Sequence, residues 1–420
     1  MAAKNLFFAH SGGVTSVLNA IAASVIETAK ESEEINRVYA GKNGILGLLN
    51  EELIDTYQES SADIKSLYVT PSSAFGSCRY KLKEHETEKF ARIIEVLKAH
   101  NIGHFLYNGG NDSQDTTLKV WQMSQKMGYK LNCIGIPKTV DNDLAGTDTC
   151  PGFGSVAKYI ALSTKEASFD VASMSATSTK VFILEVMGRH AGWIAAAAGL
   201  AAETESDGPH IILFPEIAFD KQKFFDRVRF FEKKFGHCVV VVSEGLKNNK
   251  GDIIAASMSS TDAFGHKQLG GVAPLLANMV STELGLKTHW SVPDYLQRSA
   301  RHISSTTDFE QACALGKAAV HAALKNESGI MVNIERKSNT PYVWSVGQVK
   351  LETVANVEKK LPNDFITEDG MHITEAARTY LEPLILGEEF SPFKKNGLPA
   401  YVKLKNITIP QKTKASTLIT

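Results

Sequence analysis

Two carboxylates stand two residues apart in the stretch PKTVDND at 137–143. Asp141 and Asp143 follow Lys138 and Thr139, and a short apolar run at 134–136 comes directly before this stretch. If that run is a strand, its end presents all four side chains at a ligand crevice. A carboxylate there can take a proton from a hydroxyl nucleophile or hold a metal ion, and a lysine can neutralise phosphoryl oxygens. The structural alternative is an Asx turn built by the Asp and Asn residues.

Two glycine-containing loops could bind an anion. SGG at 11–13 contains Gly12 and Gly13, and GGNDS at 109–113 contains Gly110, Asn111, Asp112 and Ser113. Glycine lets backbone N–H groups approach a phosphate, and a following helix adds its N-terminus. SGG alone also fits a glycine needed for packing. In GGNDS, the carboxylate of Asp112 stands where it would repel some phosphates, so this residue bears on which phosphate donor fits.

Four further stretches carry groups suited to an anionic sugar. They are GSCR, ending at Arg79; MGRHAG, with Met187, Gly188 and Arg189; SEG, with Glu244; and YLQRSAR, with Tyr295 and Arg298. Arginine forks match phosphate oxygens, and a carboxylate accepts hydrogen bonds from sugar hydroxyls. Each stretch, taken alone, also fits a charged helix face or a solvated strand end.

The composition excludes several classes of protein. Lys and Arg number 45 against 46 Asp and Glu, so binding of nucleic acid through overall positive charge is excluded. Five scattered cysteines without a CxxC pair argue against a disulfide framework or a zinc site and favour a reducing cytoplasm. The longest apolar stretches, such as 191–202, are too short to cross a membrane.

The pattern along the chain predicts an α/β fold. Short apolar runs at 6–9, 105–107, 134–136, 181–186, 211–214 and 239–242 alternate with helical patterns. In the first helical pattern, Val17, Leu18, Ile21 and Val25 share one face. Such alternation is typical of βαβ units and parallel sheets, whose ligands gather beyond the carboxyl ends of the strands. From about residue 386 the helical period is lost, and we expect an extended C-terminal segment that packs on the body or on a neighbouring subunit.

Taken together and in order, these motifs resemble the phosphofructokinase family over roughly residues 5–385. SGG, GSxR, GGND, PKTVDND, GFG at 152–154, EVMGR, SEG and YLQR all follow the family's sequence order. The resemblance implies two Rossmann-like three-layer domains with mostly parallel sheets and an active site in the cleft between them. It places 1–156 and about 297–345 in a phosphoryl-donor domain, 157–296 and about 346–390 in a sugar-phosphate domain, and 391–420 in a C-terminal extension. It also implies a homodimer or homotetramer in which a neighbouring subunit completes the sugar-phosphate site.

The resemblance assigns roles to individual residues. Asp141 is the base for the sugar 1-hydroxyl, Thr139 and Asp143 flank it, and Lys138 meets the transferred phosphoryl group. The sugar-phosphate side also matches Met187, Gly188, Arg189, Glu244, Tyr295 and Arg298, and the donor side matches Gly12, Gly13, Gly110, Ser113 and Arg79. Lys180 stands where the family often has an arginine contributed across a subunit interface; lysine keeps the charge but not the bidentate fork.

Asp112 indicates the phosphoryl donor. ATP-using members of the family read GGDG in this loop, with a small glycine beside the nucleotide phosphates. A carboxylate at this position would crowd and repel the α-phosphate of ATP, whereas pyrophosphate has neither an α-phosphate nor an adenosine. Lys138, where many ATP-using members have glycine, can then meet the pyrophosphate. Asp112 is the stronger marker, because some ATP-using members also carry the lysine.

Two departures from the family pattern carry their own expectations. Asn111 stands where most relatives have an aspartate near Mg²⁺, so the magnesium is expected to depend more on Asp143 and the substrate. Residues 16–29 contain none of the arginines that bind nucleotide effectors in regulated ATP-using relatives. We therefore expect little or no allosteric control by nucleotides.

The expected reaction is reversible phosphoryl transfer from pyrophosphate to the 1-hydroxyl of fructose 6-phosphate, with no nucleic-acid or membrane partner. Three alternatives stand beside it. An ATP-dependent sugar-phosphate kinase is disfavoured by Asp112. An NAD kinase shares a GGDG-type loop but does not account for PKTVDND, EVMGR and YLQR together. A non-catalytic subunit that senses sugar phosphate would be expected to lose the base, whereas Asp141 is present.

Overall fold

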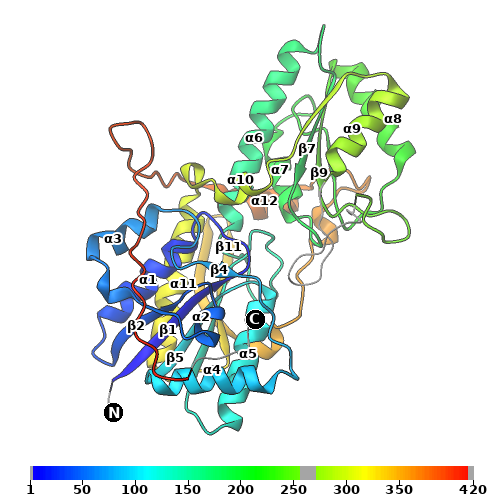
Figure 1. Ribbon diagram of the computed structural model, residues 1–420. Coiled ribbons are helices and arrows are strands. Elements are labelled where there is room, and N and C mark those ends of the chain that lie inside the picture. Colours follow the sequence, from blue (N-terminus) through cyan, green and yellow to red (C-terminus); the bar gives the residue numbers. More distant parts are fainter. Residues whose placement is uncertain (1–2, 256–270, 415–420) are drawn as a thin grey trace.

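The computed structural model describes residues 3–255 and 271–414, and its strands form two separate sheets (Figure 1). The larger sheet has eight strands in the order β12-β11-β6-β5-β1-β2-β3, with β4 paired to β1. All its pairings are parallel except β2 with β3 and β11 with β12. Its strands are β1 Lys4–Ser11, β2 Ile35–Gly41, β3 Leu53–Asp55, β4 Ser77–Cys78, β5 Ile102–Gly109, β6 Asn132–Pro137, β11 Ile330–Asn339 and β12 Tyr342–Lys350.

The smaller sheet is parallel throughout, in the order β10-β7-β9-β8. Its strands are β7 Val181–Val186, β8 Ile211–Leu213, β9 Cys238–Ser243 and β10 Thr288–Ser291. Helices cover both faces of each sheet, so the predicted α/β class with mostly parallel sheets and three-layer packing is confirmed. The α-helices are α1 Leu18–Lys30, α2 Leu46–Leu49, α3 Ser61–Ser66, α4 Thr87–Ala99, α5 Asn111–Lys126, α6 Phe153–Met174, α7 Trp193–Ala198, α8 Lys221–Phe235, α9 Val272–Leu284, α10 Tyr295–Ser299, α11 Thr306–Leu324 and α12 Glu375–Leu381.

The first strand shows why its apolar run is continuous. Leu6 and Phe8 pack with α1 and α11 on one face of the sheet, and Phe7 packs with α4 on the other. Successive strand residues point to opposite faces, so a strand covered on both sides needs an apolar residue at every position. The same alternation in β7 sends Leu184 toward α6 and α7, and Ile183 toward α8 and α9. The carboxyl ends of these strands face the space between the two sheets.

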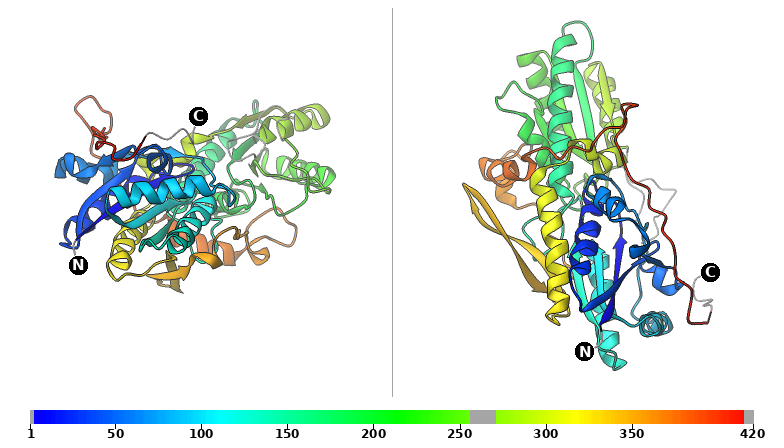
Figure 2. Two further views of the ribbon diagram at one scale, coloured as in Figure 1. Left: turned by 60° about the horizontal axis from the view of Figure 1, so that its bottom comes forward. Right: turned by 90° about the vertical axis from the view of Figure 1, so that its left-hand side faces the viewer.

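Residues 391–414 of the predicted C-terminal extension run along the body of the larger half (Figure 2). The Asp55 N–H donates to the Ile407 carbonyl at 3.0 Å, and the Ile409 N–H donates to the Leu53 carbonyl at 2.8 Å. The segment thus covers β3, which is the last strand of the larger sheet on that side. Covering an edge strand satisfies its backbone groups and prevents pairing with other chains. Residues 415–420 lie outside the described residues.

Candidate active site

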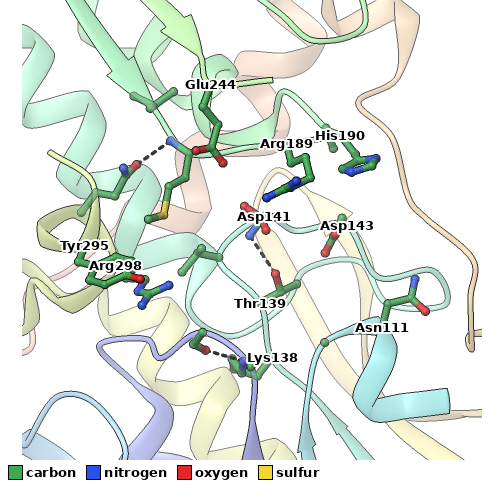
Figure 3. A pocket seen from close by; sticks show the side chains of 18 of the residues that line it. Asn111, Lys138, Thr139, Asp141, Asp143, Arg189, His190, Glu244, Tyr295 and Arg298 are labelled. Atoms are coloured by element: carbon green, nitrogen blue, oxygen red, sulfur yellow. Dashed lines mark hydrogen bonds between the residues drawn. The ribbon is translucent and has the colours of Figure 1, made fainter. Parts of the chain in front are cut away.

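A cavity of about 560 Å³ lies where the two sheets face each other (Figure 3). Its walls come from the loops that follow β1, β5 and β6 of the larger sheet and β7 and β9 of the smaller sheet. Sixteen of the predicted site residues line it: Gly12, Gly13, Arg79, Gly110, Asn111, Asp112, Ser113, Lys138, Thr139, Asp141, Asp143, Met187, Arg189, Glu244, Tyr295 and Arg298. Groups that are far apart in the sequence therefore converge on one cleft, as expected for the carboxyl ends of parallel strands.

Lys138 ties the first glycine loop to the end of β6. Its Nζ donates to the carbonyl of Ser11 at 2.7 Å and to that of Gly13 at 2.5 Å, and the side chain is buried. Gly12 lies between these two acceptors with φ +77°, a conformation that favours glycine. An ammonium has three donors, so one N–H of Lys138 is left for an anion in the cavity. Burial, followed by the charges of Arg298 and Arg79, lowers the Lys138 pKa to about 7.

The first turn of α5 presents Asp112 to the cavity. Lys81, which sequence reasoning missed, pairs with it: Lys81 Nζ lies 2.7 Å from Asp112 Oδ1. The hydrogen bond to Asp112 raises the Lys81 pKa, so this lysine stays protonated and positively charged. The pair keeps the Asp112 carboxylate at the donor end of the cleft while offsetting its charge.

The turn at 139–143 is held by Asn142, which does not line the cavity, and by Thr139, which does. Asn142 is buried with φ +53°; its Oδ1 accepts from the Cys150 N–H at 3.0 Å and its Nδ2 donates to the Tyr380 hydroxyl at 3.2 Å. Thr139 Oγ1 accepts from the Asp141 N–H at 3.1 Å. The middle residue of the DND triplet therefore fixes the turn, and the two flanking carboxylates are left facing the cleft (Figure 3).

Asp141 is a half-buried carboxyl with a raised pKa. Burial is the main cause, followed by the charges of Asp143 and Glu244, and together these raise the Asp141 pKa to about 7. Burial also raises the pKa of Asp143, and it raises that of Glu244 to about 7. A carboxyl group with a pKa near neutrality is well matched to accept a proton from a substrate hydroxyl.

The loops after β7 and β9 form the opposite wall. Gly188 has φ +128°, and a Cβ added there would meet the Ala191 carbonyl at 2.7 Å, so only glycine fits. The Gly188 carbonyl accepts from Ser243 Oγ at 2.5 Å, which ties the two loops together. Gly188 itself lies between two residues that line the cavity, Met187 and Arg189.

Arg298 reaches the glycine loop from α10. A Cβ added at Gly13 would lie 2.9 Å from Arg298 Nη1, so the absence of a side chain at Gly13 permits this approach. The guanidinium also stacks 3.8 Å from the ring centroid of Tyr295. Burial lowers the Arg298 pKa, but a guanidinium remains charged in proteins. Predicted for the sugar-phosphate side, Arg298 thus also borders the donor side.

Lys180 is not brought to this cavity. It precedes β7 whereas Met187 follows it, so the whole strand, about 20 Å at 3.3 Å per residue, separates them. Its Nζ lies 3.7 Å from Glu232 Oε1 of α8. Within one chain Lys180 cannot reach the cleft, and the prediction that it serves a neighbouring subunit stays a prediction.

Several cavity residues were not predicted. Gln297 and His190 stand inside recognised motifs, and the Gln297 side-chain oxygen accepts from the Met187 N–H at 3.2 Å. Glu185 accepts from the N–H groups of Gly271 and Ala273, at the start of α9. Glu358 comes from a segment without any motif, so nothing in the local sequence pointed to it.

The polar side chains of the cavity suit a Mg²⁺ ion that is shared between the protein and its substrate. Within residues 3–255 and 271–414, no group of three or more His, Cys, Asp or Glu side chains is arranged to hold a metal ion. Mg²⁺ usually binds one or two carboxylates together with waters and substrate phosphates, without an all-protein cage. Asp143 beside Asp141 in a cleft of cationic side chains fits such a shared site. The Asn111 amide, predicted as a ligand, is hydrogen-bonded to the backbone at 356–357.

Comparison with known proteins agrees with this geometry. Residues 5–323 match the family described as Phosphofructokinase, and the chain belongs to that family. It is 57% identical to the pyrophosphate–fructose 6-phosphate 1-phosphotransferase of Methylococcus capsulatus over 419 residues, 99% of both chains. A relative of the same name from Halomonas elongata is 57% identical over 98% of this chain and 99% of its own.

The solved structures that this chain resembles include phosphofructokinases. The pyrophosphate-dependent phosphofructokinase of Nitrosospira multiformis has a TM-score of 0.91 and 59% identity, with 99% of this chain and 100% of that one covered. Phosphofructokinase from Pichia pastoris, 21% identical with a TM-score of 0.66, shares the fold. Among the described residues, no helix is both long enough and apolar enough to span a membrane.

Proposed function

We propose that the protein transfers a phosphoryl group reversibly between pyrophosphate and the 1-hydroxyl of fructose 6-phosphate. The products in the forward direction are fructose 1,6-bisphosphate and phosphate. The observation that carries the choice of donor is the Asp112–Lys81 pair beside Gly110 in the cleft, because a carboxylate held there would crowd and repel an α-phosphate. The names of the relatives, which are 57% identical over nearly the whole chain, support the same reaction.

Asp141 acts as the base in this proposal. It accepts the proton of the sugar 1-hydroxyl as that oxygen bonds to phosphorus and the bond to the bridging oxygen of pyrophosphate breaks. The leaving phosphate takes a proton from solvent, and Asp141 afterwards releases its proton to solvent, so the proton balance closes. Thr139 orients the turn by accepting from the Asp141 N–H. Because the transition state needs little covalent help, the protein mainly positions the reactants and stabilises their charge.

The donor side is proposed to bind pyrophosphate through the loops of the larger sheet. Lys138 and Arg79, together with the loops that contain Gly12, Gly13, Gly110 and Ser113, face its oxygens. The third N–H of Lys138, which is not used in tying the glycine loop, is placed to donate to a phosphoryl oxygen. A nearby anion also favours the charged form of this lysine.

The acceptor side is proposed to hold the sugar phosphate. Glu244 accepts from sugar hydroxyls beside Met187 and Gly188, while Arg189, Arg298 and Tyr295 contact the anionic end of the sugar. Lys180 of a neighbouring subunit would complete this side, in a homodimer or homotetramer. The placement of Lys180 at the far end of β7 supports that arrangement, since the lysine cannot reach the cleft of its own chain.

Asp143 is the carboxylate proposed to hold Mg²⁺ together with the phosphates. When bound, the metal ion neutralises the charge that develops on the phosphoryl oxygens. A turnover that needs no divalent cation would remove this assignment.

We propose in addition that the protein works in the cytoplasm, without nucleic-acid or membrane partners. We also propose that it responds little to nucleotide effectors. The absence of arginine from residues 16–29 supports the last point. A sigmoidal response to fructose 6-phosphate that ADP relieves would contradict it.

The test of the function is a coupled assay of fructose 1,6-bisphosphate formation with magnesium, run with pyrophosphate and with ATP. Turnover with pyrophosphate alone is the expected result. Turnover with ATP alone would overturn the choice of donor but not the fold. No turnover with either donor would favour the sugar-phosphate-sensing alternative.

A further inference from the structure

The segment at 354–361 links the two halves of the molecule beside the active site. It follows β12 of the larger sheet, and Leu361 then joins the core of the smaller half. Along the way, the Lys359 N–H donates to the Asp143 carbonyl at 2.7 Å. The Lys359 carbonyl accepts from Trp193 Nε1 at 3.1 Å, next to the loop that carries Arg189. We call residues 354–361 the crossover segment; it passes beside Asn111 in Figure 3.

Asn111 binds this segment through both ends of its amide. Its Nδ2 donates to the Val357 carbonyl at 2.9 Å, and its Oδ1 accepts from the Asn356 N–H at 2.6 Å. Only an amide can donate and accept in this way; an ionised aspartate would lose the donor and place its charge against the Val357 carbonyl. The asparagine therefore matches the contact, whereas an aspartate does not.

A second contact supports the same attachment. Asn356 has φ +61°, and its Nδ2 donates to Asp115 Oδ1 at 3.0 Å. Asp115 is itself paired with Lys119, 2.6 Å away on the next turn of α5. The start of α5 thus holds the crossover segment at two places. Two residues further along, Glu358 lines the cavity, and its Oε1 lies 3.5 Å from Nδ1 of His190 on the opposite wall.

We infer that Asn111 is a positioning residue that fastens the crossover segment to α5, and that it is not a magnesium ligand. Fastened in this way, the segment forms part of the cavity wall and joins the loop of Arg189 to the donor loop. Loosening it changes the shape of the donor side, since Asn111 is adjacent to Asp112. It leaves Asp141 and Asp143 in place, because their turn is held by Asn142, through the Cys150 N–H and the Tyr380 hydroxyl, and by Lys359 of the segment, and none of these hydrogen bonds involves Asn111. The kinetic test of this inference rests on the proposed reaction, whereas the structural test does not.

The structural test is hydrogen exchange of the crossover segment without substrates or metal. Asn111→Asp keeps the acceptor and removes the donor, and Asn111→Ala removes both. Loss of one or both hydrogen bonds is expected to speed exchange at 354–361 by about 3- to 10-fold, more in the alanine variant. Asn396→Asp makes the same charge change on an exposed turn, where its oxygen only accepts, and is expected to change nothing at 354–361. Unchanged exchange in both Asn111 variants would overturn the inference.

The kinetic test separates fastening from metal binding. For Asn111→Asp we expect the KM for pyrophosphate to rise about 3- to 10-fold, with kcat and the half-saturating Mg²⁺ each within about twofold of wild type. If Asn111 instead ligated the metal, the added carboxylate would lower the Mg²⁺ needed. A lower Mg²⁺ requirement would therefore overturn the inference. Asn356→Ala breaks the second contact and is expected to reproduce the faster exchange without touching position 111.

Discussion

The two walls of the cleft differ in how completely one chain builds them. On the donor wall, Lys138 bonds the glycine loop after β1, and Ser77 Oγ of β4 donates to the Gly12 carbonyl at 2.7 Å, so that loop is tied to two other strands of its sheet. On the sugar-phosphate wall, Tyr295 is 61% exposed and Lys180 lies at the wrong end of β7. The wall proposed for the donor is cross-linked by hydrogen bonds within the chain, whereas the wall proposed for the sugar phosphate carries an exposed tyrosine.

This difference follows from the size of the two reactants and from the number of strands in each sheet. Pyrophosphate is small and can be surrounded by adjacent loops at the carboxyl ends of neighbouring strands. A sugar phosphate is longer, and the four-stranded sheet offers fewer loop ends around it. In the proposed function, this exposed side is where Lys180 of a second subunit adds positive charge.

The largest expected effect lies at the point where the walls meet. Replacing Asp141 with serine removes the base, and kcat should fall by about 10²–10⁴. The KM values for pyrophosphate and fructose 6-phosphate should change less, because neither wall is dismantled. Initial rates over both substrates measure this directly. A fall in kcat of less than about threefold would remove Asp141 from the role.

The sugar-phosphate wall can be tested at Lys180, which lies outside the cavity of its own chain. Lys180→Met should raise the KM for fructose 6-phosphate about 10- to 100-fold through loss of a charged hydrogen bond, and leave that for pyrophosphate unchanged. Mixed with Asp141→Ser subunits under exchange, it should regain about a quarter of the wild-type sites, because a hybrid dimer holds one intact site of two. Lack of any recovery in exchanging subunits would mean that Lys180 serves no neighbouring site.

The donor wall can be altered at Asp112. Asp112→Gly should allow measurable turnover with ATP and raise its kcat/KM about tenfold or more, because both the bulk and the negative charge are removed. Asp112→Asn, which keeps the bulk, tells the two causes apart. If neither variant uses ATP better than wild type does, Asp112 is not the residue that excludes nucleotide.

The smallest expected effect concerns the stability of the fold at acid pH, not the activity. It depends on buried histidines in both halves of the molecule. Burial lowers the pKa of His10 to about 3, and it lowers those of His104 and His210 to about 4. These residues stay neutral in the folded chain but take up protons when unfolded below about pH 6.5. Each therefore lowers the free energy of unfolding as the pH falls, by up to about 1.4 kcal/mol per pH unit, until its folded pKa is reached.

His210 offers a clean check of this effect. Its Nδ1 accepts from the Val239 N–H at 2.9 Å, a contact that an asparagine oxygen can replace. His210→Asn should lose about 2 kcal/mol less than wild type between pH 7 and pH 5, as measured by urea unfolding. An equal loss in both proteins would mean that His210 is protonated in the folded state as readily as in the unfolded one.

Six strands of the two sheets were readable from the sequence, whereas β2, β3, β4, β10, β11 and β12 were missed. The apolar runs predicted as strands became β1, β5, β6, β7, β8 and β9, because strands buried on both faces must be apolar throughout. The edge strands β10 and β12 escaped notice, since their side chains are largely half-buried or exposed and show no apolar run. The short β4 has too few residues to show any pattern.

For the site, the sequence alone determined which chemical groups are available. The glycines of the loops and the carboxylates of the DND triplet have the same chemistry wherever they lie in the fold. Only the tertiary structure decided how these groups are used. It paired Lys81 with Asp112, brought Glu358 to the cavity and placed Lys180 beyond reach of its own cleft. It also turned the Asn111 amide to a segment 245 residues away. Contacts between distant segments depend on the packing of whole sheets, and no local pattern records that packing.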